Sequence, residues 1–144
     1  MPLLENRYRT VDLGLLLLRI GLGLMFVLHG YPKLMGGPEK WLGVGLAMEN
    51  LGISFAPKVW GFLAALAETL GGQLLALGLL FRGACVFLLL TMIVAAVAHI
   101  AQGEGFGGYS HAVESGIVFL ALAFIGPGKY SVDQALFPPR RRLY

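Results

Sequence analysis

The chain has 144 residues, of which 57% are hydrophobic and 13% are charged, and its mean hydropathy is +0.75. Soluble domains carry about 25% charged residues, so this composition excludes an ordinary soluble protein and predicts an integral membrane protein. A chain of this length has room for about four bilayer crossings with short loops between them. The net charge of +3 comes from basic residues that flank apolar segments, so we expect a lipid bilayer and no nucleic acid as the partner.

Four apolar segments predict an all-α fold, an antiparallel four-helix bundle that forms a single membrane domain over residues 1–144. The spans are expected at about residues 13–35, 59–80, 83–102 and 109–125. Only Phe81 and Arg82 separate the second span from the third, and so short a link forces an antiparallel hairpin.

The segment 36–58, between the first two spans, carries polar residues that interrupt the apolar pattern. Its apolar residues recur at helical spacing from Trp41 onward, and Pro38 suits a helix start. We therefore expect a short amphipathic helix at the membrane interface with Trp41 as an aromatic anchor, and an irregular loop is the alternative.

The second span carries a carboxylate, Glu68, near its middle. An ionised side chain at that depth costs at least about 2.5 kcal/mol, so Glu68 needs a partner on another helix. Small residues share its helical face, which lets a second helix approach closely; they are Gly61, Ala65, Gly72 and Ala76.

The first span is the expected source of that partner. Asp12, Arg19, Phe26 and Lys33 recur every seven residues and lie on one face of the helix. We expect the long side chain of Arg19 to reach Glu68, at a depth that differs by about one helical turn, and His29 or Lys33 is the alternative partner.

The distribution of Lys and Arg predicts the orientation of the spans. Seven of these residues fall on the side of the two termini and three on the other side, so we expect both termini in the cytoplasm. With this topology, six ionisable groups from four helices converge on the outer half of the bundle: His29, Lys33, Glu68, His99, His111 and Glu114.

These groups are open to structural interpretations as well as functional ones. Arg19 and Glu68 as a buried ion pair would fix the helix register, and Lys33, His99 and His111 would extend to the interface, because they lie near span ends. No span contains H-x-x-x-H or E-x-x-H, so a metal site is not expected. The single cysteine, Cys85, cannot form an internal disulfide, so electron chemistry would need a bound cofactor or a partner.

Several segments carry a resemblance to a known family. LLRIGLGLMFVLHGYPKL, AETLGGQLLALGLLFR, GFGGYSHAVE and GPGKYSVD, in this order, resemble the DoxX family of small bacterial membrane proteins over Leu17 to Leu136. The resemblance implies a four-span protein of the bacterial cytoplasmic membrane, with characteristic polar positions at Arg19, His29, Lys33, Glu68, Glu114 and the Gly126–Gly128 turn. The family is named after a relative that is a membrane subunit of a thiosulfate:quinone oxidoreductase, which implies other membrane or redox subunits as partners. A homo-oligomer is the alternative.

We therefore expect a membrane subunit of a redox-linked complex, not an enzyme by itself, whose polar pocket accepts a quinone headgroup. The expected ligand-binding residues supply donors for quinone carbonyls and carboxylates that relay protons: Arg19, His29, Lys33, Glu68, His99, His111 and Glu114. The alternatives are a non-catalytic scaffold subunit and a pathway for a small solute or a proton.

Overall fold

The structure, a computed structural model, describes residues 10–138, and over this range it contains helices and no strands. Four helices are long and apolar enough to cross a membrane: α1 (Val11–Met35), α3 (Pro57–Leu77), α4 (Phe81–Ala101) and α5 (Phe106–Ile125). Each begins two or three residues before the start expected from the sequence. The predicted all-α fold with four spans is confirmed.

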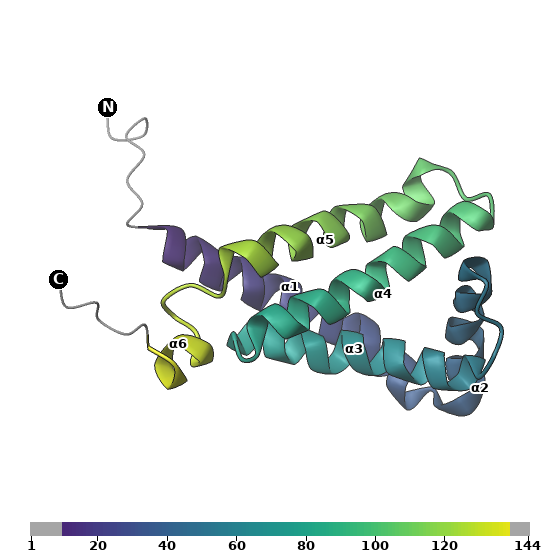
Figure 1. Cartoon of the computed structure of the whole chain (residues 1–144), viewed down its shortest axis with the longest axis horizontal. Coiled ribbons are helices and arrows are strands. Elements are labelled where there is room, and N and C mark those ends of the chain that lie inside the picture. The colour runs from purple at the N-terminus through teal and green to yellow at the C-terminus, as the bar shows by residue number, and fades with distance from the viewer. Residues whose placement is uncertain (1–9, 139–144) are drawn as a thin grey trace.

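The four spans form two layers of two helices each. In one layer α1 packs along α3, and in the other α4 packs along α5. The layers are joined by the turn between α3 and α4 and separate toward the other end of the bundle (Figure 1). This arrangement leaves space between the layers at the end where α1 finishes and α5 starts.

Close contact between α1 and α3 depends on glycines of both helices. A Cβ added to Gly23 would lie 2.5 Å from the carbonyl oxygen of Gly72, and one added to Gly30 would lie 2.6 Å from the backbone nitrogen of Thr69. Because only glycine allows the backbones this close, the small-residue face of the second span has the packing role that its sequence predicts.

A short helical segment connects α1 to α3, as predicted, in place of an irregular loop. It consists of α2 (Gly37–Gly45) and a 3-10 turn, η2 (Leu46–Leu51). The segment crosses α3 at backbone contact, since a Cβ on Gly45 would lie 1.7 Å from the carbonyl oxygen of Pro57. η2 then packs against α4, so the segment bridges the two layers at their open end.

Trp41 of α2 has a more specific contact than the expected interfacial anchor. Its indole N–H donates to the carbonyl oxygens of Lys33 and Leu34, each at 3.1 Å, and its ring packs edge-on against Phe62 at 5.0 Å. The last carbonyls of a helix have no partner within the helix, so Trp41 caps the end of α1.

An apolar core fills the middle of the bundle and joins the two layers. Phe26 of α1 meets Phe119 of α5 edge-to-face with ring centroids 4.8 Å apart. Below this contact lie fully buried side chains of α3, α4 and α5, including Leu75, Phe81 and Leu88. The core separates two polar regions at opposite ends of the bundle.

Candidate functional site

The first polar region lies where α1 begins and holds Arg19. The Arg19 side chain is buried, and its guanidinium donates to the carbonyl oxygen of Pro127 at 3.0 Å and to that of Tyr130. The predicted ion pair between Arg19 and Glu68 is therefore wrong. Glu68 lies level with Gly30, eleven residues further along α1 and about 16 Å away by helical rise, which is beyond the reach of an arginine side chain.

Two aspartates complete this region, and we call Asp12, Arg19 and Asp133 the clamp. Asp12 accepts from the backbone N–H of Lys129 at 2.8 Å. Asp133, which lies in the short helix α6 (Val132–Leu136), accepts from the backbone N–H groups of Leu80 and Phe81 at 2.8 and 2.9 Å. Those N–H groups begin α4 and have no partner within the helix, so the clamp fastens the segment after α5 to α1 and to the α3–α4 turn.

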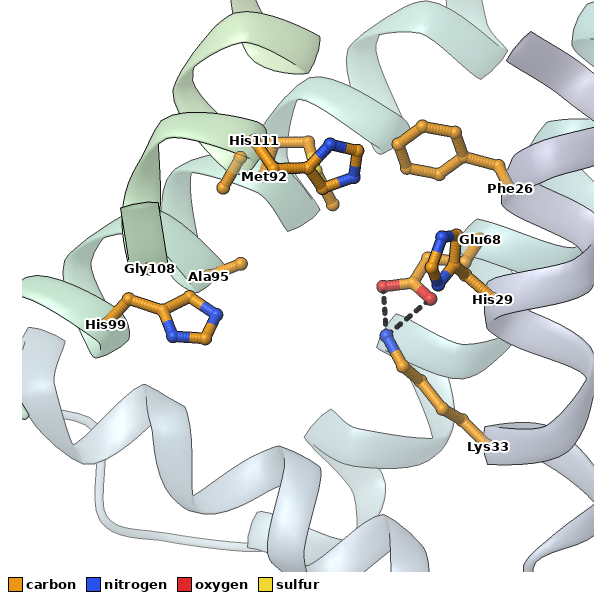
Figure 2. A pocket seen from close by; sticks show the side chains of 10 residues that line it. Phe26, His29, Lys33, Glu68, Met92, Ala95, His99, Gly108 and His111 are labelled. Atoms are coloured by element: carbon orange, nitrogen blue, oxygen red, sulfur yellow. Dashed lines mark hydrogen bonds and ion pairs between the residues drawn. The ribbon is translucent and has the colours of Figure 1, made fainter. Parts of the chain in front are cut away.

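The second polar region contains Glu68, whose partner is Lys33. The Lys33 ammonium lies 2.8 and 2.7 Å from the two carboxylate oxygens of Glu68 (Figure 2). The Glu68 side chain is 5% exposed and that of Lys33 is 31% exposed. The alternative of Lys33 as the partner of Glu68 is thus confirmed, and the expectation that Lys33 extends freely to the interface is wrong.

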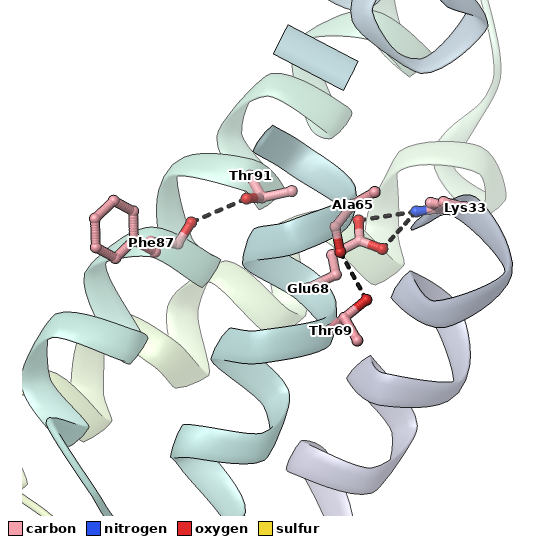
Figure 3. Close-up of polar contacts among 6 residues, drawn as sticks. All are labelled: Lys33, Ala65, Glu68, Thr69, Phe87 and Thr91. Atoms are coloured by element: carbon pink, nitrogen blue, oxygen red, sulfur yellow. Dashed lines mark hydrogen bonds and ion pairs between the residues drawn. The ribbon is translucent and has the colours of Figure 1, made fainter. Parts of the chain in front are cut away.

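Glu68 is held in place by the close packing of α1 and α3. Its Cβ lies opposite Gly30, and the neighbouring Thr69 turns its hydroxyl to the carbonyl oxygen of Ala65 at 2.7 Å (Figure 3). Thr69 therefore satisfies its own polar group within α3 and leaves Lys33 as the group that neutralises Glu68. A buried carboxylate paired with a half-exposed cation is a pair that a ligand can separate.

The ion pair faces a cavity of about 130 Å³ between the two layers, which we call the polar cavity. All three histidines of the chain line it: His29 from α1, His99 from α4 and His111 from α5 (Figure 2). The rings of His29 and His111 lie 6.0 Å apart between centroids. Apolar and small residues complete the wall, namely Phe26, Met92, Ala95, Gly108 and Ala112.

Glu104 adds to the edge of this site and was not among the predicted residues. Its carboxylate lies 2.9 Å from Nδ1 of His99, and both side chains are 40% exposed. Glu104 belongs to the glycine-rich segment before α5, and its position five residues after His99 is the sequence signal for the contact. Because this pair is exposed, it orients the imidazole more than it stabilises the fold.

Five of the seven predicted site residues line the polar cavity, and Arg19 and Glu114 do not. Glu114 was expected to converge on the same site, but its side chain is exposed on the outside of α5. The cavity-facing positions of α5 follow helical spacing from Gly108 through His111 to the buried Ser115. Glu114 lies on the other side of His111 from Ser115, which turns it away from the cavity.

Within residues 10–138, no three side chains of His, Cys, Asp or Glu lie close enough together to hold a metal ion. What the polar cavity offers is a set of hydrogen-bond donors from Lys33 and the imidazoles, next to one buried carboxylate. Such a set suits a neutral ligand with carbonyl or hydroxyl oxygens better than it suits a cation.

The fold and this site define a small polytopic membrane protein with a polar cavity between its helices. Residues 14–101 match the DoxX family, and the chain belongs to this family. It is 35% identical over 132 residues to the uncharacterized membrane protein Rv3486 of Mycobacterium tuberculosis, which covers 83% of this chain and 78% of that protein.

Two proteins of Escherichia coli are similar over most of their length. The inner membrane protein YphA is 30% identical over 143 residues, which covers 90% of this chain and 99% of that protein. The inner membrane protein YqjF is 31% identical over 128 residues, which covers 87% and 93%. No solved structure matches the chain.

Proposed function

We propose that the chain is the membrane subunit of a redox-linked complex and that its polar cavity binds the headgroup of a quinone. The observation that carries the proposal is the Lys33–Glu68 pair, which faces a cavity lined by imidazoles from three different helices. Ionisable residues within membrane spans are costly, and here an ion pair and three imidazoles surround one cavity.

The side chains of the cavity suit both the binding of a quinone and its reduction. A quinone carbonyl accepts hydrogen bonds, and the donors around it are the Lys33 ammonium and the N–H groups of His29, His99 and His111. Reduction to the quinol consumes two electrons and two protons. Glu68 and the imidazoles are positioned to relay protons. The electrons come from a partner subunit, because the lone Cys85 is buried and a single thiol is not a dithiol redox centre.

A second hollow supports a ligand that also has an apolar part. It has a volume of about 280 Å³ and lies between α4 and α5. Met92 and Ala112 line both this hollow and the polar cavity, so the two spaces share a wall. An isoprenoid tail beside the headgroup would lie against apolar side chains such as Ile93 and Ile117.

A scaffold role is the second candidate, and one observation favours it. Lys33 and Glu68 neutralise each other and link α1 to α3, as an ion pair with a purely structural role would do. A solute or proton pathway has less support, because the core around Phe26, Leu88 and Phe119 lies between the polar cavity and the clamp.

The quinone proposal is tested by titrating the purified protein, in lipid nanodiscs, with a short-chain ubiquinone analogue. Binding is followed by quenching of tryptophan fluorescence, since Trp41 packs at the end of α1 near the cavity. We expect His29→Ala to weaken binding by about tenfold, the value of one lost hydrogen bond to a polar ligand atom.

The matched control is Thr91→Val. Thr91 is also a polar residue within a span, but its hydroxyl donates to the carbonyl oxygen of Phe87 in its own helix at 2.9 Å (Figure 3). Its replacement is expected to leave binding unchanged. If the analogue does not bind the parent protein, or if His29→Ala binds as the parent does, the quinone site is refuted and the scaffold role is favoured.

We also propose that the protein lies in the bacterial cytoplasmic membrane with both termini in the cytoplasm, as the seven-to-three distribution of Lys and Arg supports. In a Cys85→Ala background, single cysteines at Asn50 and Glu104 should react with an impermeant thiol reagent in intact cells. A cysteine at Gln134 should react only after lysis. Labelling of Gln134→Cys but not Asn50→Cys in intact cells would reverse the orientation.

A further inference from the structure

The turn that ends α4 places an acid beside a histidine of the polar cavity. The backbone N–H of Glu104 donates to the carbonyl oxygen of His99 at 3.1 Å, and the N–H of Gly103 donates to that of Ile100 at 3.0 Å. With Gly103 at a φ of 73°, these bonds form a Schellman motif. The motif commonly brings two apolar side chains together at the positions of His99 and Glu104. Here it brings an imidazole and a carboxylate to 2.9 Å.

Gly108, near the start of α5, allows the Glu104 side chain to take this position. A Cβ added to Gly108 would lie 2.6 Å from the Cβ of Glu104 and would overlap its carboxylate. Gly108 also lines the polar cavity, so Glu104 contacts both the end of α4 and the start of α5 at the edge of that cavity. Because both side chains of the pair are 40% exposed, a proton on His99 can exchange with water.

The contact with Glu104 determines which ring nitrogen of His99 carries a proton. An ionised carboxylate has only acceptor oxygens, so Nδ1, which faces it, must be the N–H. In the neutral ring Nε2 then has a free lone pair. The ring points into the polar cavity, and Nε2 forms no hydrogen bond with residues 10–138 (Figure 2).

The other polar side chains of the cavity do not offer such an acceptor. His29 and His111 form no hydrogen bond or ion pair within the described range, so their tautomers are not fixed. The Lys33 ammonium only donates, and both carboxylate oxygens of Glu68 already accept from it. Among the described side chains that line the cavity, His99 is therefore the one with a nitrogen or oxygen acceptor that is both fixed and free.

We infer that Nε2 of His99 is the atom that exchanges a proton with the ligand of the polar cavity, and that Glu104 is its positioning residue. The inference rests on the proposed function and deepens it, because a quinol presents a hydroxyl where a quinone presents a carbonyl. When a bound hydroxyl gives its proton to Nε2, the O–H bond breaks, the Nε2–H bond forms and the electron pair stays on the oxygen.

The charge of His99 then decides which form of the ligand is preferred. The imidazolium has the Glu104 carboxylate as its counter-ion, and its Nε2–H donates to a carbonyl. The neutral ring accepts at Nε2 from a hydroxyl. Neutral His99 therefore favours the quinol, and charged His99 favours the quinone.

The tautomer is tested without a ligand, by NMR of the histidine ring nitrogens in the full chain in lipid nanodiscs at about pH 8. His99→Gln identifies the signals of His99. We expect a protonated Nδ1 and an unprotonated Nε2 in the parent protein. In Glu104→Ala, and in Gly108→Ala, which displaces the Glu104 side chain, both nitrogens should show averaged shifts.

The matched control for this measurement is Glu49→Ala. Glu49 is an exposed acid of η2, which also packs against α4, and its removal should leave the His99 signals unchanged. A protonated Nε2 in the neutral ring of the parent, or a Glu104→Ala spectrum identical to that of the parent, overturns the inference.

The proton exchange is tested by comparing the affinities of a short-chain ubiquinol analogue, kept reduced, and of its quinone form. At about pH 8 the parent should bind the quinol more tightly, and Glu104→Ala should lower this preference by about threefold. At about pH 5, where a histidine is usually charged, the parent should lose the preference. The other titratable groups around His99 remain in Glu104→Ala, so any pH dependence that they cause persists there: His29, Lys33, Glu68 and His111 of the cavity, and Glu49 of η2.

The outcomes of this comparison separate the inference from the proposed function. A preference that is independent of pH, or equal in the parent and Glu104→Ala, contradicts proton exchange at His99 while the quinone site stands. If neither form binds, the quinone site and the exchange fail together.

Discussion

The clamp and the polar cavity lie at opposite ends of one bundle, and they differ in what their charged groups contact. Arg19 and Asp12 bond to backbone groups of the loop after α5, and Asp133 accepts from the N–H groups that begin α4. Lys33 and Glu68 bond to each other beside an open space lined by imidazoles. A charged side chain that forms its hydrogen bonds with the backbone stabilises the fold, whereas a charged side chain that faces a cavity is available to a ligand. Arg19 thus separates from Lys33, Glu68 and the three histidines, although the sequence places all of them among the expected ligand-binding residues.

The largest expected effect is on the clamp. Arg19→Met removes a buried guanidinium and leaves the carbonyl oxygens of Pro127 and Tyr130 without donors, and we expect the free energy of unfolding in detergent to fall by about 3 kcal/mol. The control is Arg82→Met, which removes an exposed arginine near the same end and should change stability by less than about 0.5 kcal/mol. Equal stability of the two variants would show that the clamp does not hold the fold.

The Lys33–Glu68 pair should show a smaller and asymmetric effect. Lys33→Met leaves a buried carboxylate unneutralised and is expected to cost about 2 kcal/mol, whereas Glu68→Gln leaves a half-exposed lysine and should cost less. Because the double variant removes both charges, it should recover most of the loss, with a coupling energy of at least about 1 kcal/mol. Additive single effects, measured by thermal unfolding, would mean that the two residues do not form a pair in the membrane.

The smallest expected effect is the coupling between the two regions. A double-mutant cycle on Arg19 and Glu68 should give a coupling energy below about 0.5 kcal/mol, because Glu68 lies level with Gly30, about 16 Å from Arg19 along the axis of α1, and the two residues share no partner. A coupling above about 1 kcal/mol would restore the ion pair that the sequence suggested.

The fold could be predicted from the sequence because the bilayer fixes the length and the hydropathy of each span. The heptad of Asp12, Arg19, Phe26 and Lys33 and the small-residue face around Glu68 also predicted which sides of α1 and α3 meet. The partner of Glu68 could not be predicted in the same way. Both Arg19 and Lys33 lie on the correct face, and the choice depends on the relative shift of two helices, which the contact of Gly30 with Thr69 sets.

The clamp shows what the sequence does not reveal about loops. Asp133 caps the start of α4 from 52 residues away, and no local pattern links the two positions. Glu114 illustrates a second limit, because its place in the chain puts it near His111, whereas helical phase turns it outward. Depth along a span can be counted from the sequence, but the phase of one helix relative to its neighbours requires the packed bundle.

The most direct test of the difference between the two regions is the thermal shift that a short-chain ubiquinone analogue produces in two variants. We expect the Lys33→Met, Glu68→Gln double variant to unfold near the temperature of the parent protein and to show no shift with the analogue. Arg19→Met should unfold at a lower temperature and keep the shift. A double variant that is still stabilised by the analogue, or an Arg19→Met variant that is folded but no longer responds to it, would contradict the assignment of the ligand to the polar cavity.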